Sequence, residues 1–326
     1  MKKVFTFVLA MAISVASPIH AMAENITRTD AEAKPSEQNI EQIIENITST
    51  PHPINSDTIQ NVKEYIMRYF SDLGYDDMEC QKFEYNDENN ENAIRRSSQA
   101  EIFLAPTAEN AVVDGTGENI IVTKKSSTDT LKNLIISAHY DSSEDSVGAN
   151  DNGSGVAAVL ELARILKDVE MPHNIKFIMF SGEEKYMLGS RWYVGNLTED
   201  ERNQIIGVIN IDTIAEKSDL GYMAMIEENK RPEDVEYDDE GLKKLAKLNK
   251  NSMSELFTSS DRFYLTMASN SDHYPFALLD IPAVSIVQDW QEGLNINDSS
   301  DVKENLDPNR IVEVIDQIDG VLPDIT

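Results

Sequence analysis

Residues 133–167 read NLIISAHYDSSEDSVGANDNGSGVAAVLELARILK, in which an apolar run, a polar loop and a second apolar segment follow one another. The run at 133–138 is strand-like. At 153–167 the apolar residues recur on one face of a helix, while the charged residues lie elsewhere. A further apolar run at 174–180 follows this helix. Strand, helix and strand in this order predict two parallel strands joined by a crossover helix.

The same alternation continues on both sides of this unit. Apolar runs at 119–123, 205–211 and 283–287 are strand-like, and a helix is expected from about Met187. Strands that alternate with helices build a largely parallel sheet with helices on both of its faces. The sequence therefore predicts an α/β fold with three layers, α/β/α, around a central mixed, mainly parallel sheet.

The N-terminus has the features of a secretory signal peptide. Lys2 and Lys3 precede an apolar stretch at 4–16, and Ala21-Met-Ala23 has the small–x–small pattern of a cleavage site. The apolar stretch is shorter than the roughly 20 residues that a membrane-spanning helix needs, and nothing later in the chain approaches that length. We therefore predict a signal peptide at 1–23, a secreted or periplasmic protein, and no stable membrane insertion.

The segment behind the signal peptide differs in composition from the rest of the chain. Residues 24–45 are polar and rich in Glu, Asn and Thr, which predicts a polar, mobile leader. Residues 46–326 are predicted to form one domain, since this length can bury a single large core. Cys80 is the only cysteine, so the chain forms no internal disulfide and depends on that core.

The chain is strongly acidic, with 28 basic and 58 acidic residues and a formal charge of −30. Loss of Lys2 and Lys3 with the signal peptide would leave 26 basic residues and a charge of −32. Such a charge argues against nucleic acid as a partner, because phosphate binding depends on Lys and Arg. Solubility outside the cell explains the excess of acid. Attraction of cationic ligands, such as free peptide amino termini, is a second explanation that the composition leaves open.

Metal-type side chains follow the predicted strands at the points where these strands end. His139 directly follows the run at 133–138, and Asp212 directly follows the run at 205–211. Ligands of open α/β sheets bind beyond the carboxyl ends of the strands, so these residues are expected to meet. The full candidate set is His139, Asp151, Glu183, Glu184, Asp212 and His273.

Each candidate alone has a simpler explanation. A single histidine at a strand end is usually a hydrogen-bonded polar residue, Asp151 could cap the helix that follows it, and adjacent glutamates are often solvated. The combination is harder to explain in this way, because three strands deliver His, Asp or a Glu pair to one rim. Histidine and carboxylate ligands suit zinc, and a carboxylate can bridge two ions.

Two further residue types fit a metal hydrolase. Adjacent side chains on an extended segment point in opposite directions, so Glu183 and Glu184 can divide into a metal ligand and a general base. Asp141, two residues after His139, is placed to accept the second N–H of the imidazole.

The motifs occur in a recognisable order. They are Ala138-His-Tyr-Asp-Ser142, Gly148-Ala-Asn-Asp-Asn-Gly-Ser-Gly155, Ser181-Gly-Glu-Glu184, Leu188-Gly-Ser190, Asn210-Ile-Asp212 and Ser271-Asp-His273. In this combination the chain resembles the co-catalytic zinc aminopeptidases, the exported exopeptidase family that contains bacterial leucine aminopeptidase, aminopeptidase S and aminopeptidase Y. The resemblance runs from about residue 50 to the C-terminus. It implies that 46–326 is a zinc exopeptidase catalytic domain acting on peptides with a free N-terminus.

The resemblance also implies a role for each candidate residue and a cofactor of two zinc ions per chain. The implied ligands are His139 and Asp212 for one ion, Glu184 and His273 for the other, and Asp151 as the bridge. Glu183 would be the general base and Asp141 would orient His139. Two neighbouring ions can activate water and stabilise an oxyanion together.

One position departs from the family pattern. In the segment 295–301, similar proteins usually carry a His before a Thr/Ser and an Asp, and here Asn297 takes that place. The departure leaves the five implied ligands and the base in place. It puts in doubt any substrate-contact or oxyanion role borrowed for this segment.

Three other functions remain as alternatives. A carboxypeptidase would use the same two metals and differ only in its pocket. A glutaminyl cyclase, with one zinc on the same scaffold, is disfavoured because only four residues separate Glu184 from Gly189. A metal-free binding protein is disfavoured because no implied ligand is lost. The oligomeric state and the preferred first residue of the substrate are left open.

Overall fold

The computed structural model describes residues 34–95, 103–104, 112–227, 239–258, 260–290 and 293–325, so the predicted signal peptide lies outside the described residues. The strands are β1 (Met78–Tyr85), β2 (Gly115–Lys124), β3 (Asn133–His139), β4 (Asn174–Phe180), β5 (Ile205–Ile211), β6 (Tyr222–Ile226), β7 (Phe263–Met267) and β8 (Ala283–Gln288). The helices are α1 (Glu37–Ile47), α2 (Asp57–Leu73), α3 (Asp87–Ile94), α5 (Gly153–Leu166), α6 (Leu188–Gly195), α7 (Glu199–Gln204), α8 (Asp239–Asn249), α9 (Ser252–Glu255), α10 (Tyr274–Ala277) and α11 (Pro308–Val321).

All of these strands belong to one sheet, in the order β1-β2-β4-β3-β5-β8-β6-β7. The central pairs β4–β3, β3–β5 and β5–β8 are parallel, and so is β6–β7 at one edge. The pairs β1–β2, β2–β4 and β6–β8 are antiparallel. The predicted mixed, mainly parallel sheet is therefore confirmed.

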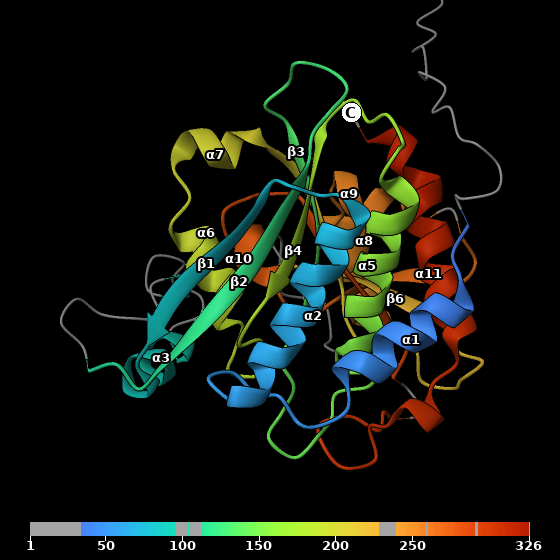
Figure 1. Ribbon diagram of the computed structural model, residues 1–326. Helices are drawn as coiled ribbons and strands as arrows, with labels where there is room; N and C mark the ends of the chain where they lie inside the picture. Colours follow the sequence, from blue (N-terminus) through green and yellow to red (C-terminus); the bar gives the residue numbers. More distant parts are fainter. Residues whose placement is uncertain are drawn as a thin grey trace, which may run out of the picture.

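Helices cover both faces of the sheet, which gives the predicted three layers (Figure 1). Leu134 and Ile136 of β3 point into the larger core, with α1, α2, α5 and α11. Ile135, between them, points to the opposite face and packs with residues of α6 and α10, including Tyr193 and Phe276. Alternate residues of β3 are thus buried on opposite sides, because successive side chains of a strand point to opposite faces.

Helix α1 corrects the predicted boundary at residue 45. It begins at Glu37, inside the segment predicted as a mobile polar leader, and the Ser36 side chain caps it by accepting from the N–H of Asn39. Its isoleucines recur at helical spacing and are at most 3% exposed: Ile40, Ile43, Ile44 and Ile47. The polar residues between them masked this narrow apolar stripe. Residues 37–45 therefore belong to the core of the domain.

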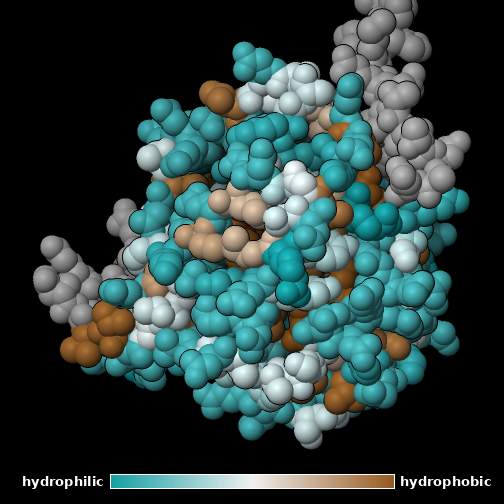
Figure 2. All heavy atoms as spheres, in the orientation of Figure 1, coloured by the Kyte–Doolittle hydropathy of each residue, from teal (hydrophilic) through white to brown (hydrophobic). Residues whose placement is uncertain are grey.

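The outer surface is largely hydrophilic on the face shown in Figure 2. Figure 2 shows mostly hydrophilic residues over the face on which α1, α2, α5 and α11 lie, with scattered hydrophobic ones. Within the described ranges, no helix combines the length and the apolar character needed to cross a lipid bilayer.

Candidate metal centre

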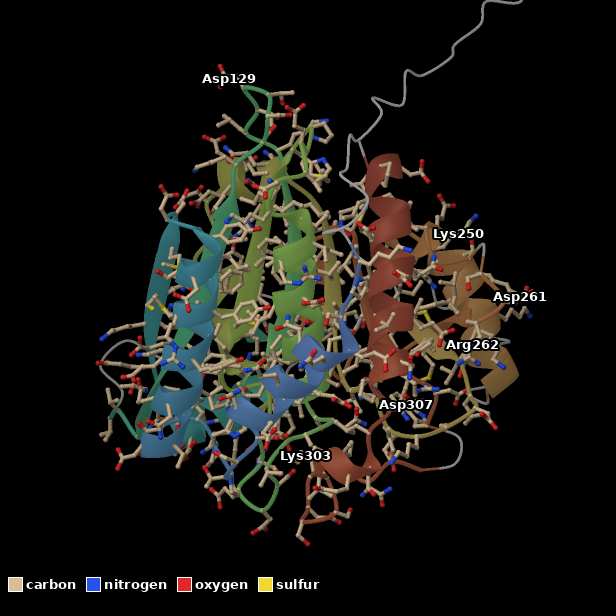
Figure 3. All side chains as sticks on the ribbon, turned by 45° about the vertical axis from the view of Figure 1, so that its right-hand side comes forward. Asp129, Lys250, Asp261, Arg262, Lys303 and Asp307 are labelled. Carbon is tan, nitrogen blue, oxygen red and sulfur yellow. The ribbon has the colours of Figure 1, made fainter. Side chains whose placement is uncertain are left out.

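The carboxyl ends of three neighbouring strands carry the candidate residues. β3 ends at His139, and β5, its parallel neighbour, ends at Ile211, directly before Asp212. β4, the other neighbour of β3, ends at Phe180, three residues before Glu183. In Figure 3, Asp129 marks the opposite end of the molecule, in the loop before β3. Parallel pairing therefore delivers all three loops to one rim, as the sequence predicted.

His139, Asp151 and Asp212 converge at this rim. The His139 Nε2 atom lies 3.1 Å from Asp151 Oδ1 and 3.5 Å from Asp212 Oδ1. Their ligand atoms all lie within 4.8 Å of one another, and among the described residues no other group of three or more His, Cys, Asp or Glu side chains meets this condition. The His139 side chain is fully buried, and its Nε2 has no hydrogen-bond partner of proper geometry.

Burial and the neighbouring charges shift the pKa values of this group. The neighbouring carboxylates outweigh burial and raise the pKa of His139 well above its usual value. Burial raises the pKa of Asp151, and the nearby Asp212 carboxylate adds to this effect. A divalent cation at this place would offset the repulsion between the two carboxylates and bind the neutral imidazole. One imidazole and two carboxylates are ligands that zinc accepts, so the residues fit this ion.

The loop that carries Asp151 is fixed by its neighbours. The Asn152 side chain caps α5 by accepting from Gly155 N at 3.0 Å, accepts from Thr213 N at 3.1 Å and donates to Ile211 O at 2.9 Å. Asn152, and not Asp151, is therefore the helix cap. This result removes the simpler explanation for Asp151, whose carboxylate is left to face His139.

A carboxylate that the sequence did not single out holds the same loop from the other side. Asp301, which is 1% exposed, accepts from Asn150 N at 2.6 Å and from Asp151 N at 3.1 Å. Burial raises its pKa to about 6, and these two N–H donors counteract the rise. The signal available in the sequence was its place in the family segment 295–301. Its buried contacts depend on long-range packing.

Asp141 has a broader role than predicted. The His139 Nδ1 atom lies 3.1 Å from the Asp141 backbone carbonyl oxygen and 3.6 Å from the carboxylate Oδ1. The carboxylate accepts from Glu183 N at 3.1 Å and from Glu184 N at 3.3 Å. Asp141 therefore orients the imidazole mainly through its carbonyl group, and its side chain positions the glutamate pair.

The two glutamates lie at different places on the rim. Glu183 Oε2 is 4.0 Å from His139 Nε2, at the edge of the three-residue group. Burial raises the pKa of Glu183 well above its usual value, and the Asp212 and Asp272 carboxylates raise it further. Glu184 contacts the side chain of Asn297 instead. Burial, followed by the Asp151 carboxylate, raises the pKa of Glu184 to about 8.

The structure does not bring His273 into this group. Its Nε2 lies 2.9 Å from the Ala268 carbonyl oxygen, and no group within the 4.8 Å limit includes it. Its segment reaches the site through Ser271, whose hydroxyl donates to Asp212 Oδ2 at 2.6 Å. Ser271 in turn accepts from Asn210 Nδ2 at 2.8 Å. The SDH motif thus contacts the candidate ligand Asp212 through its serine.

The sequence profile described as "Peptidase family M28" matches residues 119–321, which is more than half of the chain and includes the whole rim. The chain belongs to peptidase family M28. The order of the motifs predicted a relationship to the zinc aminopeptidases, and this membership confirms that prediction.

Curated relatives of this M28 chain match over part of their length. Aminopeptidase YwaD of Bacillus subtilis (strain 168) is 42% identical over 105 residues, which cover 32% of this chain and 23% of that protein. Aminopeptidase Y of Saccharomyces cerevisiae is 34% identical over 99 residues, which cover 30% of this chain and 18% of that protein. The matched regions thus span less than a quarter of either relative.

Solved structures with similar folds cover nearly the whole chain. The zinc aminopeptidase BSAP from Bacillus subtilis has a TM-score of 0.71 at 18% identity, covering 90% of this chain and 96% of that chain. Glutaminyl cyclase from Porphyromonas gingivalis has a TM-score of 0.67 at 16% identity, covering 90% and 99%. At these identities the likeness shows the shared fold alone.

Proposed function

We propose that this M28 member is a metal-dependent aminopeptidase, which removes N-terminal residues from peptides. The observation that carries the proposal is the buried Nε2 of His139, which faces the Asp151 and Asp212 carboxylates with Glu183 4.0 Å away. Such a group is suited to hold zinc beside a general base. The family and the names of the two curated relatives support the same activity.

The residues of the rim divide the chemical work. Zinc held by His139, Asp151 and Asp212 would supply a Lewis acid toward water and the scissile carbonyl group. Glu183 would accept a proton from the attacking water and donate it to the leaving amine. Its raised pKa suits a carboxyl group that must hold a proton during the reaction. Asp141 would position this base through the Glu183 backbone N–H.

We also propose a second cation position, which would share Asp151 with the first. The Asp151 Oδ1 atom faces His139, and its Oδ2 lies on the side of Asn297, 3.5 Å from the amide. Glu184 lies against the same amide. One carboxylate with an oxygen toward each side is the arrangement that a bridging ligand needs.

The substrate would be a peptide with a free, positively charged N-terminus. A formal charge of −30 and the carboxylates of the rim favour a cation over an anion. A C-terminal carboxylate would meet the same acidic rim unfavourably, which argues against the carboxypeptidase alternative. Glutaminyl cyclase activity is the second candidate, because a cyclase shares the fold over 90% of this chain.

A substrate panel with zinc supplied tests these possibilities. We expect hydrolysis of amino-acid anilides with a free amino group, no hydrolysis of N-blocked or C-terminal probes, and no cyclisation of an N-terminal glutamine. Glu183→Gln should lower kcat by about 10²–10⁴-fold and leave the zinc content unchanged. Glu199→Gln, at an exposed position in α7, is the matched control. Full activity of Glu183→Gln would exclude Glu183 as the base.

The proposal includes export from the cell. It is supported by the charged and apolar stretches of 1–23 and by the cleavage pattern at Ala21-Met-Ala23. N-terminal sequencing of the protein recovered outside the cytoplasm should begin at Glu24. A mature N-terminus at Met1 would rule out cleavage.

A further inference from the structure

We infer that Asn297 completes the second cation position with Glu184 and Asp151, and that this position, built from oxygen ligands alone, takes a hard divalent cation such as Mn²⁺ in place of a second tightly bound zinc. The inference rests on the proposed function and specifies its metals. It predicts one tight zinc site and one weaker site for a hard cation in each chain.

The contacts of Asn297 point to this role. Its amide group lies 2.8 Å from Glu184 Oε1 and 3.0 Å from Glu184 Oε2, on the side opposite its 3.5 Å contact with Asp151 Oδ2. With the amide nitrogen toward Glu184, Asn297 donates to the carboxylate. With the oxygen toward Glu184, oxygen atoms face one another, and a shared cation stabilises that arrangement. In both orientations the Asn297 amide lies between the Glu184 carboxylate and Asp151 Oδ2.

The backbone holds Asn297 at this place from both directions. Upstream, Asn295 N donates to Glu216 Oε2 at 3.0 Å. Downstream, Asp301 accepts from Asn150 N and Asp151 N, so the segment is tied to the loop of the bridging ligand. Asn297 itself has φ 62°, in the left-handed region that asparagine adopts more readily than most residues. The backbone position of Asn297 is therefore set by the fold.

Three of the described histidines direct a ring nitrogen to partners other than Glu184 and Asn297. The His273 Nε2 lies 2.9 Å from Ala268 O, and its buried Nδ1 has no hydrogen-bond partner among the described residues. His52 directs Nδ1 to Thr50 O at 2.9 Å. His139 directs Nε2 to the first position, and its Nδ1 lies 3.1 Å from Asp141 O.

The donor atoms decide which ion each position prefers. Imidazole nitrogen suits zinc, whereas carboxylate, amide carbonyl and water oxygens suit Mg²⁺, Ca²⁺ and Mn²⁺. The first position offers one imidazole and two carboxylates. The second offers the carboxylates of Glu184 and Asp151 and the amide oxygen of Asn297. We therefore expect zinc to bind the two positions with clearly different affinities.

Metal binding to the metal-free full chain tests the inference without any substrate. Titration calorimetry and elemental analysis after dialysis should give one tightly bound zinc per chain. Titration of the zinc-loaded protein with Mn²⁺, followed by electron paramagnetic resonance, should show one additional, weaker Mn²⁺ site. Asn297→Ala should weaken Mn²⁺ binding at least tenfold and keep one tight zinc. Asn297→His should raise the number of tight zinc ions to two.

The controls separate a ligand from a general effect of the loop. Ser299→His adds an imidazole to the same exposed segment without replacing the partner of Glu184, and it should leave one tight zinc and the Mn²⁺ site unchanged. Two tight zinc ions in the unaltered protein would overturn the inference. Unchanged Mn²⁺ binding in Asn297→Ala would also overturn it. If the metals bind as expected and free-amino substrates are not hydrolysed, the proposed function fails and the metal assignment stands.

Discussion

Replacement of Ile43 by alanine tests whether α1 is part of the folded core. Ile43 is 0% exposed, and α1 packs in the core that also contains residues of α2, α5 and α11. The substitution removes three buried carbon atoms, worth about 0.8 kcal/mol each, which gives roughly 2.4 kcal/mol before any cavity forms. The cavity raises the expected loss of unfolding free energy to about 3 kcal/mol, within the usual range of about 2–5 kcal/mol.

Urea unfolding of the zinc-loaded protein, followed by circular dichroism, measures this loss. In thermal unfolding the same loss should lower Tm by about 6–12 °C, given about 2–4 °C per kcal/mol for larger domains. Glu41→Ala, at an exposed position on the same helix, is the control and should change the free energy by less than about 0.5 kcal/mol. An Ile43→Ala variant within about 1 kcal/mol of the unaltered protein would refute the packing of α1.

Three further outcomes are expected. Glu161→Ala should lower Tm through a loss of about 3–5 kcal/mol, because this fully buried carboxylate accepts from Ser36 N and binds the Arg164 guanidinium; an unchanged Tm would contradict this. Asp301→Ala should weaken zinc binding about 10–100-fold in competition with a chelator, whereas Asp298→Ala, at an exposed site in the same segment, should not. The Tm difference between protein loaded with zinc and Mn²⁺ and chelated protein should be larger at pH 8 than at pH 6. Without metal, burial raises the pKa of Glu184 to about 8. Between about pH 4.5 and 8 the folded chelated protein therefore holds a proton that the unfolded chain has lost. Because of this difference, the stability of the chelated protein falls as the pH rises through that range. A gap that narrows toward pH 8 would contradict this sign.

The central part of the fold was predictable because its elements are locally marked. The strands predicted at 133–138, 174–180 and 205–211 agree with β3, β4 and β5 to within one residue. Each is a continuous apolar run with polar residues on both sides, and α5 carries an apolar face over several turns. Local pattern and tertiary burial agree in these elements, so the sequence alone marks them.

The strands β6 and β7, at one edge of the sheet, could not be predicted from the sequence in the same way. β6 and β7 are five residues each, too short for periodicity to separate a strand from a loop. Their place depends on pairing with each other and on the antiparallel contact of β6 with β8, about 60 residues later in the chain. Helix α1 is a different case, since its four isoleucines have helical spacing but stand among polar residues that lower the average hydrophobicity.

The residues of the candidate site also fall into a part that the sequence predicts and a part that it does not. His139 and Asp212 stand directly at the ends of parallel neighbours, so their meeting follows from topology. The direction of an imidazole does not follow from topology. The family resemblance implied His273 as a ligand; its Nε2 faces Ala268 O, its Nδ1 has no partner among the described residues, and its role stays a prediction. Asn297 and Asp301 lie in a loop without regular structure, and only long-range contacts bring that loop to the rim.

The loops of the rim are held together by the protein itself, before any metal is considered. Asn152 ties the Asp151 loop to the end of β5, and Asp301 ties it to the segment of Asn297. These contacts are hydrogen bonds between side chains and backbone N–H and C=O groups. They form within the protein and do not depend on a bound cation. The candidate ligand carboxylates, in contrast, lie close together: burial and the Asp212 carboxylate raise the pKa of Asp151, and burial and the Asp151 carboxylate raise the pKa of Glu184. The fold therefore places the candidate ligands in advance, and a bound cation would relieve the repulsion between the placed carboxylates. For this reason chelation should lower the stability of a protein that stays folded, and metal selectivity should respond to single substitutions at Asn297 without a change in the sheet.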